Sequence, residues 1–277
     1  MSHDRSEHSL TGVHADSRSS MWRVLSLAIV VASALLISAC EQEQDRPDEP
    51  PAIHYRDSTI VMRNEGCTGS DDECCVVELT IPVYSGGKDG ASDSLNRRVR
   101  GFFVSLLGSN VKVDSTMPDI IEAGRNLMEE FEDFRSDFPM STVGWEVRGG
   151  AEVLANDSII CTKMEAYNYL GGAHGFWIVE FDVARVASGD TLAVLDLVSD
   201  RAAFLRAAEK GFRSAVGMAP NDSDYGSQGY WFKDNEFRFP ENIGLSKDSV
   251  IFHYNVYEIA PYSMGSVRFS LPRTLVQ

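Results

Sequence analysis

Apolar residues recur at every second position in several segments of the chain and at every third or fourth position in three others. Alternation is typical of strands, and the longer period is typical of amphipathic helices. The predicted strands cover residues 59–62, 76–83, 145–147, 159–169, 177–183, 250–257 and 267–271. The predicted helices run from a cap at Ser92 or Asp93 to Gly108, from Pro118 to Pro139, and over 200–216. Residues 218–229 are predicted to form a mobile loop.

These elements do not follow a regular βαβ order. We therefore predict an α+β fold, with antiparallel sheets and packed helices arranged in two subdomains. The expected subdomains cover residues 53–142 and 143–277.

The amino-terminal region contains an uncharged apolar run of sixteen residues, 24–39. A spanning helix needs about 20 apolar residues, so the run is closer to the apolar region of a signal peptide. It ends in the sequence ISAC at residues 37–40, which resembles the lipobox of bacterial lipoproteins. In those proteins the cysteine becomes the amino terminus and carries lipid. We therefore predict a signal peptide over 1–39, with a true start at Met21, and lipidation of Cys40. The alternative is an uncleaved anchor helix.

The segment that follows the predicted lipidation site is rich in acidic residues and proline (EQEQDRPDEPP, residues 41–51). Charge and proline keep such a segment solvated and extended. We therefore expect residues 40–52 to form a tether between the lipid and a folded body.

The charge balance limits the classes of partner. The chain has 41 acidic and 25 basic residues, a net charge of −16. This balance disfavours nucleic acid, because a phosphate backbone requires clustered Lys and Arg. It also disfavours docking on anionic lipid headgroups through protein charge, whereas it permits a cationic partner.

Four cysteines remain for the folded body: Cys67, Cys74, Cys75 and Cys161. An even number outside the cytoplasm indicates disulfides. Because a bridge between adjacent cysteines strains the backbone, we expect Cys161 to pair with one of the first three. The other two would close a small loop around residues 66–72. Zinc is the alternative, but the body has three widely separated histidines and no CxxC pair, so we expect no metal and no cofactor.

A first segment with possible function combines tyrosines, glycines and a histidine: Tyr167, Tyr169, Gly171, Gly172, His174 and Gly175. Glycine permits positive φ or close approach of another chain, and the tyrosines supply aromatic surface. We interpret this segment as a hairpin turn; the alternative is a loop that grips a ligand.

A second such segment follows the strand predicted at 250–257: Tyr257, Glu258, Pro261, Tyr262 and Met264. Its tyrosines suit either a binding patch or a packed corner. The chain contains no G-x-S-x-G elbow, P-loop or H-E-x-x-H motif, so we assign no catalytic residue. An enzyme that acts on peptidoglycan through His174, Glu258 and a tyrosine is the alternative.

The motifs Tyr-x-Tyr-x-Gly-Gly-Ala-His-Gly at 167–175 and Tyr-Glu-Ile-Ala-Pro-Tyr-x-Met-Gly at 257–265 resemble the PdaC/RsiV-like extracytoplasmic domain family. The stretch TLAVLDLV at 191–198 resembles the same family. The resemblance spans the body and is strongest from residue 143 onward, while the cysteine-bearing loop departs from it. It implies an α+β fold of two subdomains. Members include the outer domain of a lysozyme-binding anti-sigma factor and the companion domain of a peptidoglycan deacetylase.

Together these observations predict a lipid-anchored, non-enzymatic binding protein of the bacterial cell envelope, on the periplasmic side or at the surface. The expected partner is a cationic wall-active protein such as a lysozyme, or peptidoglycan, with the membrane contacted through the Cys40 lipid. A structural or assembly lipoprotein with only protein partners is a further alternative.

Overall fold

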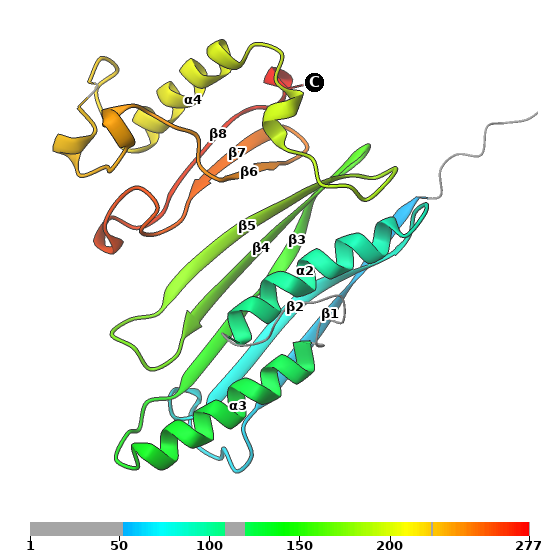
Figure 1. Ribbon diagram of the computed structural model, residues 1–277, viewed down its shortest axis with the longest axis vertical. Coiled ribbons are helices and arrows are strands. Elements are labelled where there is room, and N and C mark those ends of the chain that lie inside the picture. Colours follow the sequence, from blue (N-terminus) through cyan, green and yellow to red (C-terminus); the bar gives the residue numbers. More distant parts are fainter. Residues whose placement is uncertain (1–51, 109–119, 223, 277) are drawn as a thin grey trace, which may run out of the picture. The chain divides into compact units, whose positions relative to one another are not determined.

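A computed structural model describes residues 52–108, 120–222 and 224–276 (Figure 1). The predicted signal peptide, Cys40 and all of the tether except its last residue lie outside the described residues. No helix in the described part of the chain is long and apolar enough to cross a membrane. The described residues form one compact unit.

The first part of the body is a five-stranded sheet in the order β1-β2-β3-β4-β5. Its strands are β1 (Ile53–Arg63), β2 (Cys75–Gly86), β3 (Trp145–Asn156), β4 (Ile159–Tyr169) and β5 (Phe176–Arg185). Neighbours are antiparallel except β2 and β3, which are parallel. The α+β fold is confirmed, but the prediction of antiparallel pairing is wrong for this pair. Two helices lie between β2 and β3, and such a long crossover is what parallel pairing requires.

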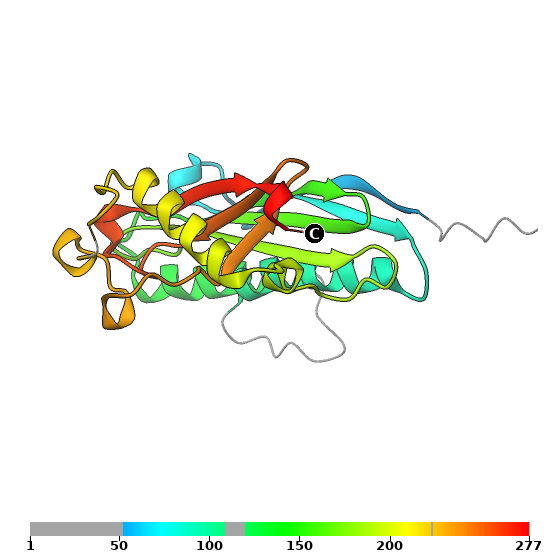
Figure 2. The ribbon, with the colours of Figure 1, turned by 90° about the horizontal axis from the view of Figure 1, so that it is seen from above.

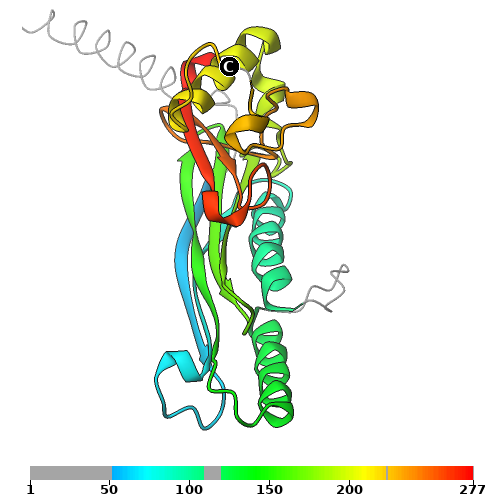
Figure 3. The ribbon, with the colours of Figure 1, turned by 90° about the vertical axis from the view of Figure 1, so that its left-hand side faces the viewer.

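Helices α2 (Ala91–Leu107) and α3 (Ile120–Asp137) cover one face of this sheet (Figure 3). Most residues of the two predicted apolar stripes are buried against it, including Leu95, Phe103 and Leu127. The predicted cap is wrong, because Ser92 and Asp93 lie inside the first turn and Gly90 is the residue before the helix. Gly90 has φ +80°, a conformation that glycine adopts without steric cost.

The second part is an antiparallel sheet of β6 (Asn242–Leu245), β7 (Ser249–Tyr254) and β8 (Val267–Pro272), with α4 (Arg201–Ala215) packed on it (Figure 2). The side chain of Asp200 caps α4 by accepting the Ala203 N–H at 2.9 Å. Strand β6 was not predicted, and β7 ends at Tyr254 rather than at residue 257. Short 3-10 turns complete the described fold: Asp71–Glu73, Val194–Leu197, Gly226–Gln228, Lys233–Asn235, Tyr262–Met264 and Arg273–Leu275.

The core of this second part is aromatic. Phe212 on α4 is fully buried, and six rings lie with their centroids 5.1–6.3 Å from its own. They belong to Tyr225, Tyr230, Phe232, Phe237, Tyr254 and Phe269. We call these seven side chains the buried ring cluster. Tyr225 lies in the segment predicted to be a mobile loop, and its buried ring anchors that part of the segment.

The cysteines only partly follow the prediction. Cys67 and Cys74 form a disulfide with Cα atoms 5.8 Å apart, which closes the small loop that was expected. Among the described residues, Cys75 and Cys161 are free and buried, so the predicted bridge to Cys161 is wrong. Cys75 lies opposite Trp145 and Cys161 lies opposite Ala155. Ten residues of β3 separate these positions, about 33 Å at the usual strand rise, far beyond disulfide reach.

Candidate functional site

The two motif segments meet although they are far apart in the sequence. The first is the hairpin between β4 and β5, and the second follows β7. The His174 ring stacks on Tyr262, with centroids 3.9 Å apart and planes at 21°, and Tyr257 lies 5.7 Å from Tyr262. Tyr167 and Trp177 pair beside them at 5.5 Å. We call these five rings the aromatic platform: Tyr167, His174, Trp177, Tyr257 and Tyr262.

Hydrogen bonds hold the two segments together. The Tyr262 hydroxyl donates to the Gly175 carbonyl at 2.7 Å, and His174 Nδ1 lies 3.1 Å from the same carbonyl. A carbonyl only accepts, so this contact places the proton of a neutral His174 on Nδ1. Nε2 can then accept the Tyr257 hydroxyl, which lies 3.4 Å away. The imidazole therefore bridges both segments.

The glycines of the hairpin serve packing more than ligand contact. Gly171 has φ +76°, and a Cβ there would lie 2.8 Å from the Trp145 indole nitrogen. A Cβ on Gly175 would overlap the Tyr167 ring, whereas Gly172 has open space around it. These contacts favour the hairpin-turn interpretation for Gly171 and Gly175.

Asn255 and Glu258 build the turn after β7. The Asn255 side chain accepts the Val179 N–H at 2.9 Å and donates to the Val179 carbonyl at 2.9 Å. The Glu258 carboxylate accepts the backbone N–H groups of Asn255 at 2.9 Å and Glu241 at 3.3 Å. Burial raises the pKa of Glu258. Within the described residues no contact joins this carboxylate to His174, so Glu258 acts here as a structural link.

Tyr257 has a backbone conformation that is uncommon for a bulky residue. Its φ is +66°, in the left-handed region, and its side chain is 54% exposed. Such a conformation costs about 1–3 kcal/mol and persists where the surroundings enforce it. The hydrogen bond between the Asn255 N–H and the Glu258 carboxylate spans this residue, and the exposed Tyr257 ring lies beside those of His174 and Tyr262.

A hollow of about 330 Å³ opens between the hairpin and this turn. It is lined by His174, Phe176, Trp177, Ile178, Asn255, Val256 and Tyr257. Its walls are mostly apolar, and Trp177 is 56% exposed beside it. Of the predicted site residues, His174 and Tyr257 reach the hollow. The others lie outside its lining: Tyr167, Tyr169, Gly171, Gly172, Gly175, Glu258, Pro261, Tyr262 and Met264.

The sequence did not indicate Asn255, because the alternating pattern of β7 continues through it to Tyr257. Only an end of the alternating pattern before Asn255 could have indicated the turn, and Tyr257 extends the predicted strand past that point. Phe176 and Trp177 were visible as an aromatic pair after the hairpin, but their position beside the second segment depends on tertiary packing.

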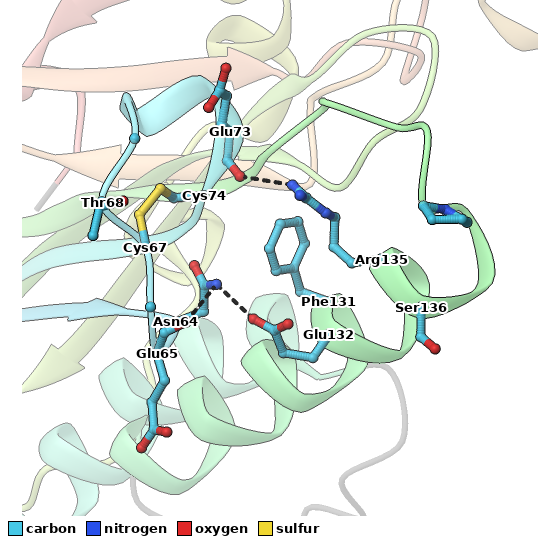
Figure 4. A pocket seen from close by; sticks show the side chains of 13 residues that line it. Asn64, Glu65, Cys67, Thr68, Glu73, Cys74, Phe131, Glu132, Arg135 and Ser136 are labelled. Atoms are coloured by element: carbon cyan, nitrogen blue, oxygen red, sulfur yellow. Dashed lines mark hydrogen bonds between the residues drawn. A yellow bond between two sulfur atoms is a disulfide. The ribbon is translucent and has the colours of Figure 1, made fainter.

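A second concavity of about 570 Å³ lies between the disulfide loop and α3 (Figure 4). The Asn64 side chain donates to Glu132 Oε1 at 2.6 Å, and Arg135 donates to the Glu73 carbonyl at 3.2 Å. These contacts join loop and helix across the opening. No group of three or more His, Cys, Asp or Glu in the described part of the chain is arranged to hold a metal ion.

The opposite face of the sheet holds the same loop by ion pairs. Asp71 contacts Arg63 and Arg148, each at 2.5 Å, and these guanidinium groups lower its pKa. Arg148 also contacts Glu146 at 2.8 Å and Glu78. This network uses Asp71 of the loop for structure, and we take the aromatic platform as the stronger candidate site.

Two stretches of the chain match described families. Residues 68–176 match the family described as deacetylase PdaC, and residues 196–274 match DUF3298, a family of proteins of unknown function. The chain carries a PdaC domain followed by a DUF3298 domain. The resemblance predicted from the two motifs is thereby confirmed. No curated protein matches the chain.

Solved structures from the DUF3298 family share the fold. One is from Bacteroides fragilis, with a TM-score of 0.58, 18% identity, and coverage of 82% of this chain and 92% of that chain. Another, from Pseudomonas aeruginosa, has a TM-score of 0.53, 18% identity, and coverage of 83% and 95%. The likeness at this identity concerns the fold alone.

The platform draws on both domains. Tyr167 and His174 lie within the PdaC match, and Tyr257 and Tyr262 lie within the DUF3298 match. The site is therefore formed where the two domains meet.

Proposed function

We propose that this protein is a lipid-anchored, non-enzymatic binding protein of the bacterial envelope. Its aromatic platform binds a cationic wall-active protein such as a lysozyme. The observation that carries the proposal is one hollow lined by the exposed rings of His174, Trp177 and Tyr257, against which the half-buried rings of Tyr167 and Tyr262 pack. Tyrosine and tryptophan give large contact areas with few rotatable bonds, and they dominate many protein interfaces.

Charge supports a cationic partner. The chain carries a net charge of −16, and segments 167–184 and 249–267, which build the platform, contain no Lys or Arg. Of their three acidic residues, Glu180 is exposed, Glu258 is half-buried in the turn, and Asp182 is buried and paired with Arg98, so the attraction rests mainly on the net charge of the chain. An acidic surface attracts and steers a basic protein, and the attraction weakens as salt rises.

The proposed location rests on residues outside the described part of the chain. The apolar run and the ISAC sequence support export and lipidation at Cys40. The Cys67–Cys74 disulfide also supports an oxidising compartment.

Metabolic labelling with an alkyne fatty acid tests the anchor. We expect the label on the wild-type chain in the membrane fraction, and its loss together with release from the membrane in Cys40→Ser. An unlabelled wild-type chain in the cytosol would contradict the proposal.

Calorimetric titration with lysozymes of different net charge tests the partner, using the unlipidated Cys40→Ser chain. We expect the double variant Trp177→Ala, Tyr257→Ala to bind at least about tenfold more weakly, as loss of central aromatic contacts typically does. Trp231→Ala is a matched control, because Trp231 is 57% exposed and lies outside the lining of the hollow. Equal loss in control and double variant, or no binding by the wild type, contradicts the proposed site.

Peptidoglycan glycan is a second candidate ligand. The observation that favours it is the hollow itself, since about 330 Å³ is near the lower limit of small-ligand pockets. Co-sedimentation with purified peptidoglycan tests this ligand. If the chain co-sediments, loses this in Trp177→Ala, and binds no lysozyme, the glycan is favoured over the protein. If the chain binds neither lysozyme nor peptidoglycan, a structural or assembly role is the remaining proposal.

A further inference from the structure

The outer edge of β5 is the starting point, since β5 is the last strand of its sheet (Figure 1). Along an edge strand, alternate residues direct their N–H and C=O groups toward the neighbouring strand and away from it. Val179 directs both groups away from β4, because both pair with the Asn255 side chain. The odd-numbered residues of β5 therefore present their backbone groups on the outer edge.

Two further contacts agree with this assignment. The Val183 carbonyl accepts the Leu192 N–H at 2.7 Å, and the Arg185 N–H donates to the Asp190 carbonyl at 2.9 Å. The chain at 190–192 therefore covers the far end of the edge, and Asn255 covers it at Val179.

Trp177 belongs to the same outward set. Its N–H and C=O lie on the outer edge beside the hollow, and no partner for them occurs in the part of the chain that the structure describes. Asn255 contacts Val179 as a residue of a neighbouring strand would, through one acceptor and one donor. Trp177 lies two residues before Val179 on the same edge. Its N–H and C=O groups are therefore available to a partner strand.

We propose that an extended segment of a cationic protein adds as a strand to the β5 edge at Trp177, with one apolar side chain in the hollow. Strand addition takes affinity from backbone hydrogen bonds and specificity from pockets for single side chains. This edge offers the N–H and C=O of Trp177, which lies between the bonded residues Gly175 and Val179, and the hollow as the pocket. The absence of Lys and Arg from segments 167–184 and 249–267 favours basic residues flanking the apolar one. The inference rests on the proposed function and names how that partner is recognised.

Residue-resolved amide hydrogen exchange on the full-length chain in detergent tests the inference. The probe is the peptide Lys-Thr-Val-Thr-Phe-Thr-Val-Thr-Lys, which is extended, basic at both ends and aromatic at its centre. The Val179 amide is an internal reference, because it is already bonded to Asn255. We expect the peptide at saturation to slow exchange of the Trp177 amide by about fivefold, as one added hydrogen bond does, and to leave Val179 unchanged.

The control probe is the same peptide N-methylated at its three central residues, which keeps the side chains and removes the backbone donors. Its failure to bind supports strand addition, and equal binding by both peptides overturns it. An unchanged Trp177 amide at saturation also overturns it.

A lysozyme titration separates this inference from the proposed function. Lysozyme binding without protection of the Trp177 amide overturns strand addition and leaves the proposed function standing. Peptide binding with protection, in a chain that binds no lysozyme, supports the edge site and contradicts lysozyme as the partner.

Discussion

The buried ring cluster and the aromatic platform use the same residue types for opposite purposes. Phe212 is fully buried on the inner face of α4, whereas Trp177 and Tyr257 are 56% and 54% exposed. The ring spacings overlap: centroids lie 5.1–6.3 Å from that of Phe212 in the cluster and 3.9–6.5 Å apart in the platform. The difference lies in what covers them: a helix closes the first group, and no described element closes the second. Ring contacts alone therefore do not distinguish a core from a binding surface, but coverage does.

Among the variants considered, Phe212→Ala, in the buried ring cluster, should cause the largest loss of stability. Removing a fully buried ring with six ring neighbours is expected to lower the free energy of unfolding by about 3–5 kcal/mol. Urea denaturation measures it. A loss of less than about 1 kcal/mol would show that the cluster is not the core of the DUF3298 domain.

Loss of the disulfide should cost less, because it constrains a short loop outside both aromatic groups. Cys67 and Cys74 are seven positions apart, and closing so short a loop is worth about 2–3 kcal/mol in the chain-entropy account. Thermal unfolding of the double variant Cys67→Ser, Cys74→Ser checks the value. Reducing agent should shift the wild type equally and leave the variant unchanged.

Gly175→Ala should disturb the platform at its base, since the added Cβ meets the Tyr167 ring. We expect a loss of about 1–3 kcal/mol, typical of overpacking, and a changed Trp177 fluorescence. Gly172→Ala is the matched control, because nothing lies within 4 Å of its Cβ. If both variants behave alike, the hairpin is less tightly packed than described.

His253 gives a pH-dependent comparison on β7, the strand that supplies Phe252 to the core of the DUF3298 domain. Burial, followed by the charge of Arg268, lowers the pKa of His253. The unfolded chain takes up a proton near pH 6.5 while the folded chain resists it, so stability should fall as the pH drops below that value. Unfolding free energies at pH 8 and pH 5.5 in wild type and His253→Gln check this. An equal decline in both would assign the effect to other groups.

Trp177→Ala should have the smallest effect on stability. An exposed side chain contributes little, so we expect a change within about 0.5 kcal/mol by urea denaturation. The difference between the stability losses of Phe212→Ala and Trp177→Ala is the most direct test of the contrast between the buried ring cluster and the aromatic platform. A large loss of stability would mean that Trp177 packs as core rather than as surface.

The secondary structure was largely predictable because periodicity reports which face of an element is buried. The span of β4 follows directly from local sequence, and the helix predicted over 200–216 corresponds to α4, although Asp200 caps the helix rather than beginning it. The parallel pairing of β2 with β3 and the free Cys161 do not, because both depend on register between strands far apart in the sequence. A short strand such as β6, four residues long, carries too little pattern to detect.

Only part of the candidate site could be predicted from the sequence. The motifs drew attention to His174 and Tyr257, and the structure brings them together. Asn255 could not be predicted, because its side chain forms hydrogen bonds with the backbone of a strand far away in the sequence, and no local pattern encodes such contacts. The hollow likewise exists only after the two domains pack.

The stacking of His174 on Tyr262 has an evolutionary consequence. One ring comes from the PdaC domain and the other from the DUF3298 domain, so neither domain encodes the platform alone. A lineage that lost, duplicated or recombined one domain by itself would discard this surface. The pair must be inherited together for the platform to persist.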